Sequence, residues 1–255
     1  MLLPGGIVRD GERRRGFAFR PVDGALEAAL AEAAAAPSML RAVTSVLAAA
    51  LAELGGEPAR EEAVRDLAVG DRQFLVRQLS VHLGHDPVWL TAVCRACGES
   101  FDFEVRQADL PVKEAGESFP YAEVGSLRLR VPTGADQEAI AGLSDERAVR
   151  LLFERCRIAG PEAGEEEIAA AESALEAASP EVALAALAGC PACGADNEIS
   201  VDPYLGLPAH GEELFAEVHR LASSYHWSEA EILALPRARR QLYLRLIDRS
   251  RGLVQ

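Results

Sequence analysis

The sequence predicts an α+β fold, mainly α, that consists of two similar units followed by a C-terminal helical segment. In each half, a strand-like alternation of apolar residues is followed by amphipathic helical periodicity. Each half then reaches a CxACG motif, with cysteines at Cys94 and Cys97 and again at Cys190 and Cys193. Apolar residues make up 49% of the chain but aromatic residues only 5%, so Leu, Val and Ala must fill the core, which favours closely packed helices.

Residues 1–16 precede the first unit, and we expect them to form an N-terminal arm that is mobile or lies at a sheet edge. The first unit spans residues 17–110. It begins with FAFRPVDGALEAAL, a strand followed by an acidic helix start, and continues with RAVTSVLAAALAELGG, an amphipathic helix that ends at glycine. A further helix starts near Asp71. The segment 99–105 is predicted to be a return strand, because acidic residues alternate with Phe101, Phe103 and Val105.

Residues 111–126 are interpreted as a linker, and the second unit spans residues 127–205. Its strand and first helices are LRLRVPTGADQEAI and RAVRLLFERCRIAG, which match the corresponding stretches of the first unit. Another helix is predicted to start at Pro180 with Ser179 as its N-cap. The acidic, Ala-rich stretch between Pro161 and Glu181 is expected to be a solvated helix or a flexible loop without chemistry.

The shared order of strand, helix, helix and CxxC leads us to interpret the units as pseudo-repeats that together complete one zinc-ribbon site. A structural zinc ion normally takes four ligands, and each CxxC supplies two thiolates. The predicted ligands of one structural Zn²⁺ are therefore Cys94, Cys97, Cys190 and Cys193. A glycine follows each motif, as a turn with positive φ requires. The alternatives are two independent pairs without metal, or a redox CxxC, which the surrounding pattern does not favour.

Three further residues are potential ligands with simpler explanations. His82 and His85 lie just before the first CxxC and are expected to end a helix that stops at Gly84. Cys156 shares a predicted helix face with Leu152 and Phe153, so we expect it to be buried.

The C-terminal helical segment, residues 206–255, has a different composition. A helix begins near Glu212, a capping box joins Ser228 to Glu231, and a last helix begins at Pro236. This last helix makes the end of an acidic protein basic. The aromatic cluster beside it is either a docking site or a local hydrophobic contact between helices, and the arginines face an acidic surface of this protein or of a partner. The candidate partner-binding residues are Tyr225, Trp227, Arg237, Arg239 and Arg240.

The overall charge and the motif content exclude several classes of protein. The formal net charge is −14, which opposes a general nucleic-acid coat protein, because phosphates would be repelled by most of the surface. No uncharged apolar run approaches the roughly 18 residues of a membrane-spanning helix, and MLLPGG lacks the features of a signal peptide, so we expect neither a membrane span nor a secretory signal. The sequence has no nucleophile elbow, P-loop, dinucleotide fingerprint or HExxH, and a zinc ion with four cysteines has no open position, so we expect no enzyme.

Several stretches together resemble a family of baseplate proteins from contractile-tailed phages and contractile injection systems, the family that includes a T-even phage baseplate hub assembly protein. These stretches are FAFRPVDG, VGDRQFLVRQL, VCRACGESFDFEV, LRLRVPTGADQEA, CPACG and, most distinctively, EVHRLASSYHWSEAEILALPRARRQLYLRLI. One departure is Asn197, which stands where the first motif has Phe101 and predicts a frayed second half of the ribbon.

The resemblance implies a non-enzymatic assembly factor, chaperone or component of the baseplate hub. Its partners would be baseplate, hub or spike proteins, and it would act in the cytoplasm of the producing cell or stay in the particle. The second hypothesis is a zinc-ribbon protein that binds nucleic acid or acts with transcription, which the charge of −14 opposes. A redox enzyme is the third.

Overall fold

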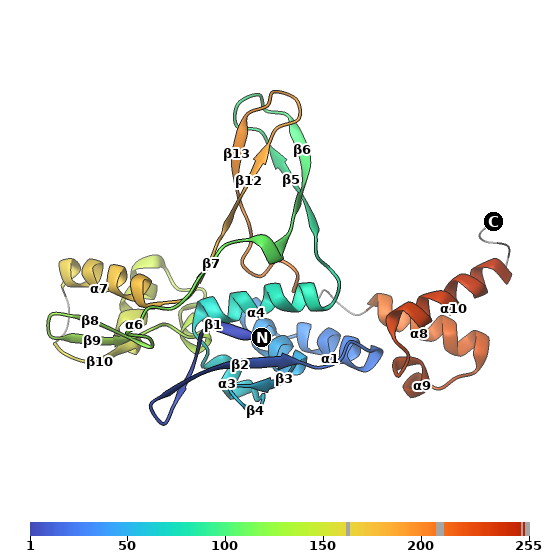
Figure 1. The fold of residues 1–255 in the computed structure, drawn as a ribbon, viewed down its shortest axis with the longest axis horizontal. Coiled ribbons are helices and arrows are strands. Elements are labelled where there is room, and N and C mark those ends of the chain that lie inside the picture. The colour runs from blue at the N-terminus through green and yellow to red at the C-terminus, as the bar shows by residue number, and fades with distance from the viewer. Residues whose placement is uncertain (162–163, 208–211, 251, 253–255) are drawn as a thin grey trace.

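The structure is a computed structural model that describes residues 1–161, 164–207, 212–250 and 252. Helices hold 45% and strands 25% of these residues, so the fold is mixed and helices outweigh strands, as the sequence predicts. A central body carries a ribbon of two β-hairpins that stands away from it, and a group of helices at the C-terminus lies at one end of the body (Figure 1). Among the described residues, every helix is too short or too polar to cross a membrane.

The first part of the body is a four-stranded sheet packed against helices. Its strands lie in the order β1 (Leu2–Arg9), β2 (Glu12–Phe19), β3 (Leu51–Leu54) and β4 (Glu57–Pro58). The helices are α1 (Gly24–Ala34), α2 (Met39–Ala50), α3 (Glu61–Arg65) and α4 (Val69–His82). Asp23 and Ser38 accept backbone N–H bonds at the starts of α1 and α2, which explains where these helices begin. The main apolar core lies here and includes Phe17, Val46, Leu47, Leu75 and Leu79.

The expected N-terminal arm, residues 1–16, lies at the edge of this sheet and contributes to its core. β1 pairs antiparallel with β2, and the side chain of Leu3 is fully buried. The carboxylate of Asp71 on α4 accepts the backbone N–H groups of Gly5, at 2.6 Å, and Gly6, at 2.8 Å. β1 is the edge strand of the sheet, so the sheet-edge alternative is confirmed. A mobile arm is wrong, because apolar burial and these two hydrogen bonds fix β1 against α4.

The second part of the body contains a smaller sheet. Its strands lie in the order β10 (Arg157–Ala159), β9 (Leu127–Arg130) and β8 (Tyr121–Val124). Helices α5 (Gly134–Ile140) and α6 (Asp145–Cys156) connect β9 to β10, and α7 (Glu165–Ala178) packs against β8. At the start of α5, the buried Asp136 binds Arg130 and Arg155 and accepts the N–H of Thr133. Burial raises the pKa of Asp136, but these partners outweigh burial and hold it well below its usual range.

Two predictions for this region were wrong. Residues 111–126 are no linker, because β7 (Val112–Lys113) pairs with β11 (Glu181–Val182) and β8 lies in the sheet. No helix starts at Pro180. Ser179 instead follows the end of α7, within the acidic stretch that was predicted as helix or loop. The buried Val182 holds β11 in place, and the Pro180 carbonyl lies so close to Gly70 that a Cβ there would be 2.0 Å from its oxygen.

Helix α4 lies in the middle of the body and buries polar as well as apolar side chains. Besides Asp71, it buries Arg72, which donates to the carbonyl of Leu40 at 3.0 Å, and Arg77, which donates to the carbonyl of Ala183. The predicted helix near Asp71 is thus confirmed, with a start at Val69. One helix therefore contacts both parts of the body through its charged residues.

The C-terminal segment forms three helices that pack on one another and on α1. They are α8 (Glu212–Tyr225), α9 (Glu229–Leu233) and α10 (Arg237–Ser250), as predicted. The predicted capping box at the start of α9 is confirmed, with Ser228 and Glu231 bonded in both directions. Their shared apolar cluster consists of Val218, Leu221, Ile232, Leu244 and Ile247.

We expect Asp71→Ala to reduce the free energy of unfolding by about 2–6 kcal/mol, because two buried N–H groups lose their acceptor and each such loss costs about 1–3 kcal/mol. Urea denaturation of the two proteins measures the difference. The matched control is Asp66→Ala, at an exposed position, which should change the free energy by less than about 0.5 kcal/mol. Equal effects of the two substitutions would show that Asp71 does not hold β1.

The effect of Asp71→Ala should also depend on pH. Burial raises the pKa of Asp71 from 3.8 to about 6 despite the N–H bonds from Gly6 and Gly5. A raised pKa means that the folded protein favours the protonated carboxyl, so the contribution of this group is complete below the unfolded pKa and declines as the pH rises through about 6. The destabilisation should therefore be larger at about pH 5 than at about pH 8. An increase towards high pH would contradict this direction.

Candidate metal centre

Two β-hairpins from distant parts of the chain form the ribbon. The first consists of β5 (Val88–Val93) and β6 (Ser100–Val105), followed by the short 3-10 helix η1 (Gln107–Asp109). The second consists of β12 (Ala185–Gly189) and β13 (Asp196–Ser200). The hairpins lie together, and the turn of each, at the end that points away from the body, carries one CxxC motif (Figure 1).

The two CxxC turns have the same backbone hydrogen bonds. In the first, the Cys94 N–H donates to the Glu99 carbonyl at 2.8 Å, and the Gly98 N–H donates to the Cys94 carbonyl at 2.9 Å. In the second, Cys190 donates to Ala195 and Gly194 donates to Cys190, both at 2.9 Å. Gly98 and Gly194 have φ values of 77° and 74°, which confirms the prediction that these turns need glycine.

The four sulfur atoms come within 4.8 Å of one another. Cys94 Sγ lies 3.6 Å from Cys193 Sγ, and Cys97 Sγ lies 3.8 Å from Cys190 Sγ. A tetrahedron of thiolates around an ion at about 2.3 Å has edges of about 3.8 Å, so the cluster has the size that such a site needs. All five cysteines are free thiols. The structure therefore brings the two distant CxxC pairs together in a site that can hold a metal ion.

The pKa values of two thiols in the cluster are shifted in opposite directions. The pKa of the Cys94 thiol is lowered to about 6, because the backbone N–H groups of Cys97 and Ala96 and the amide of Asn197 donate to its sulfur. The pKa of Cys97 is raised instead, since hydrogen bonds with the neighbouring sulfurs and burial outweigh the donor N–H of Glu99. Thiolates are the form that binds metal, so a bound cation would favour loss of the protons that the free cluster retains.

Asn197 has a role in the site that the sequence did not reveal. Its buried side chain accepts the Arg95 N–H at 2.9 Å and donates to the Ala195 carbonyl, at 2.9 Å, and to Cys94 Sγ, at 3.6 Å. The predicted fraying of the second hairpin was wrong, since β12 and β13 pair over their full length from Ala185 to Ser200. The sequence signal for this role was an amide side chain four residues after the second CxxC. It could not be interpreted from the sequence, because the partners Arg95 and Cys94 belong to the other hairpin.

The other candidate ligands lie elsewhere. His82 ends α4, contacts the Arg20 carbonyl at 2.8 Å and stacks on Phe19, and His85 lies 3.1 Å from an Arg237 nitrogen. Cys156 is buried at the end of α6, as predicted.

The candidate docking residues do not share one environment. Tyr225 and Trp227 are half-buried and stack at 4.8 Å, with the ring of Tyr243 packed against both, which is the local hydrophobic contact that the sequence left open. Arg237 and Arg239 are exposed. Arg240 is fully buried and forms ion pairs with Glu27 and Glu217, so its acidic partner is this protein itself.

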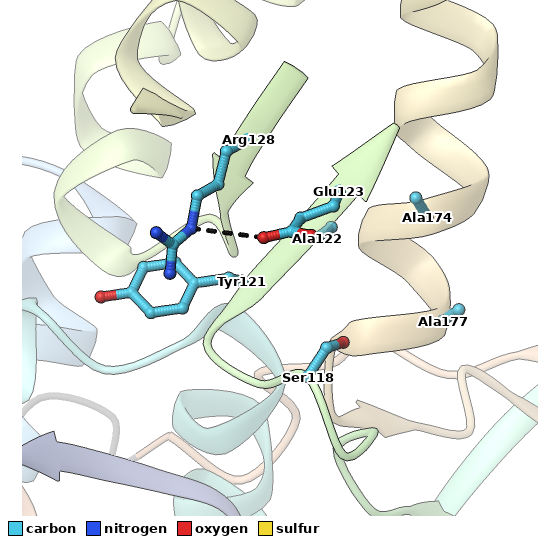
Figure 2. Close-up of a pocket in the computed structure, with 7 residues that line it drawn as sticks. All are labelled: Ser118, Tyr121, Ala122, Glu123, Arg128, Ala174 and Ala177. Carbon is cyan, nitrogen blue, oxygen red and sulfur yellow. Dashed lines mark ion pairs between the residues drawn. The ribbon is translucent and has the colours of Figure 1, made fainter. Parts of the chain in front are cut away.

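A separate pocket of about 480 Å³ lies between β8, β9 and α7 (Figure 2). The guanidinium of Arg128 covers the ring of Tyr121, at 4.4 Å, and lies 3.6 Å from a carboxylate oxygen of Glu123. Small side chains of α7 such as Ala174 and Ala177 form the opposite wall. The charges of this pocket thus neutralise each other.

Comparison of the chain with known protein families, with curated proteins and with solved structures gave no match.

We expect the double variant Cys190→Ser/Cys193→Ser to lose the metal ion entirely, because the two remaining thiolates make only half of the site. Elemental analysis should give close to one ion per wild-type chain and almost none in the variant. The matched control is Cys156→Ser, which removes a buried thiol outside the cluster and should keep the metal. Full retention by the double variant would show that the CxxC pairs bind metal independently.

We expect Asn197→Ala to weaken metal binding by about 10–100-fold, the usual effect of removing a partner that orients a metal ligand. Competition with a chromophoric chelator measures the affinity. Asn197→Asp keeps the shape and the acceptor for Arg95 but replaces the donor to Cys94 with a negative charge, so it should weaken binding as well. The exposed neighbour Glu198→Ala should have no effect, and a loss as large as that of Asn197→Ala would contradict the assigned role.

Proposed function

We propose that this protein is a non-enzymatic assembly factor of the baseplate hub in a contractile phage tail or a contractile injection system. The observation that carries the non-enzymatic part is the four-cysteine cluster, because a site with four protein ligands leaves no position for a substrate. The baseplate part is carried by the resemblance of the sequence stretches, above all of the C-terminal one.

The metal in this proposal is one structural zinc ion held by Cys94, Cys97, Cys190 and Cys193. Tetrahedral sites of four thiolates are typical of zinc, and all five cysteines are free thiols that disulfides do not consume. Bound zinc would supply structural cross-linking, with an apparent free energy of roughly 10–16 kcal/mol in comparable sites. It would join the ends of two hairpins whose other direct contacts are a small apolar cluster and the hydrogen bonds of Asn197.

We further propose that the chain consists of two pseudo-repeats, as the sequence predicts. The order of the elements supports this. A hairpin, β1–β2 or β8–β9, is followed by two helices and by a strand, β3 or β10, that pairs antiparallel with the second strand of the hairpin. Further along, each half supplies one CxxC hairpin with the same turn hydrogen bonds. The boundaries that fit these elements begin the first repeat at β1 and the second at β8.

The shape of the molecule suits a protein that binds other proteins. The ribbon and the C-terminal helices both project from the body and present large surfaces (Figure 1). The exposed Arg237 and Arg239 at the start of α10 remain candidates for contact with an acidic hub or spike protein, whereas Arg240 acts inside the fold. Positive charge at the start of a helix opposes the helix dipole, so these two arginines contribute little to the stability of α10.

The test is capture of partners from cells that are assembling particles, with the zinc-loaded protein as bait. We expect hub or spike proteins in the captured fraction, and about a tenfold loss with Arg237→Glu/Arg239→Glu, because the charge of the proposed contact is reversed. The matched control is Arg147→Glu, another exposed arginine, which should capture as well as wild type.

Normal folding and zinc content without capture of any particle protein would refute the assembly role. The assembly factor is either a transient chaperone or a permanent component of the baseplate. Mass spectrometry of purified particles distinguishes these, since a chaperone is absent or substoichiometric and a permanent component is present in a fixed ratio.

A further inference from the structure

The outward face of the first hairpin exposes two large apolar side chains. Trp89 is 67% exposed and Val93 is 64% exposed, and both point away from the packed side of β5. The opposite side of the same hairpin faces the second hairpin and buries Phe101. The fold of the ribbon therefore does not need the outward Trp89 and Val93, and exposed aromatic residues of this kind often form the centre of a binding surface.

An acidic row lies beside these apolar residues on the same face. In the register of the hairpin, Glu104 is opposite Trp89, and Asp102 is opposite Thr91. Asp102 accepts the hydroxyl of Thr91 at 2.6 Å and has no cationic partner within the described residues, while Glu104 pairs with Arg106. We call this combination of apolar and acidic residues the ribbon face.

Helix α10 exposes a surface of the opposite charge. Leu242 and Leu246 lie one turn apart and are 48% and 43% exposed. Arg245 and Arg249 are exposed on the same side of the helix, and neither has an acidic partner in the part of the chain that the structure describes. The buried side of α10, with Leu244 and Ile247, already packs in the C-terminal cluster. We call the outward surface the helix face.

The two faces cannot meet within one molecule. The ribbon stands away from the body, and α10 lies at the end of the molecule, with its buried side held against α8 (Figure 1). The contact between α1 and the C-terminal helices, strengthened by Arg240 and Glu27, fixes that position. Each face is therefore available to another chain.

We propose that the ribbon face of one copy binds the helix face of a second copy. Leu242 and Leu246 would cover Trp89 and Val93, and the arginines of α10 would lie near Asp102 and Glu104. The exposed apolar residues of the two faces can cover each other, and the charges beside them are opposite in sign. Each copy carries both faces. Two copies can therefore form a closed dimer in which the contact occurs twice, or many copies can associate head to tail. Its small area predicts weak, concentration-dependent association.

The experiment uses the full-length, metal-loaded protein in sedimentation velocity over about a hundred-fold range of concentration. Wild type should increase in mass with concentration. The ribbon variant Trp89→Thr/Val93→Thr and the helix variant Leu242→Gln/Leu246→Gln should each remain monomeric. Thr suits an exposed strand and Gln suits an exposed helix, so both variants should fold, which circular dichroism and metal content check.

An equimolar mixture of the two variants provides the decisive measurement. The helix variant still has an intact ribbon face, and the ribbon variant still has an intact helix face, so the mixture should form a complex of one copy of each. The matched control is Leu187→Thr, which removes an apolar residue that is 81% exposed on the other hairpin and should associate like wild type.

Each remaining outcome overturns the proposal. Wild type that stays monomeric over the whole range, variants that associate normally, a mixture that stays monomeric, or equal loss with Leu187→Thr would each exclude this contact. Charge reversal with Arg245→Glu/Arg249→Glu should weaken association by about tenfold, and a partner with Asp102→Arg/Glu104→Arg should restore it. Capture of hub proteins does not enter this test, so the proposed function and this inference can fail separately.

Discussion

The body of this protein depends on helix α4, whose buried charged side chains bind main-chain atoms of both halves. Asp71 accepts two N–H groups of β1, Arg72 donates to the carbonyl of Leu40, and Arg77 donates to the carbonyl of Ala183. Buried charges are costly unless they find partners, so these contacts fix the position of every segment that supplies one. Because main-chain partners do not depend on side-chain identity, α4 can hold strands and loops of very different sequence.

The ribbon has a different basis for its stability, because its apolar cluster is small. Its buried members are Cys94, Phe101, Ala188 and Cys190, and two of these belong to the four-cysteine cluster. Alanine and cysteine bury little apolar area, so this cluster alone contributes little against the entropy of ordering two long hairpins. A bound metal ion would therefore be the main stabilising cross-link of the ribbon, whereas the contacts of α4 stabilise the body.

Local patterns in the sequence determined the elements and the chemistry of the site. The CxxC motifs identified the four cysteines that lie together in the structure, and the glycine after each motif identified the turn. The last helices and the capping box of Ser228 and Glu231 were also predicted correctly. Each CxxC turn, each helix and each cap depends on residues within about four positions of one another, where helix periodicity and capping act.

Only the tertiary structure decided which surfaces are buried and which are free. Arg240 belongs to a basic run in the sequence, yet it pairs with Glu27, which is 213 positions away, and leaves the surface. The segment after Pro180 became a strand because β7 was available for pairing, and Asn197 became a support for Cys94 because the other hairpin lies beside it. Contacts between distant residues have no periodic pattern in the sequence, so they follow only from the packed arrangement of the whole chain.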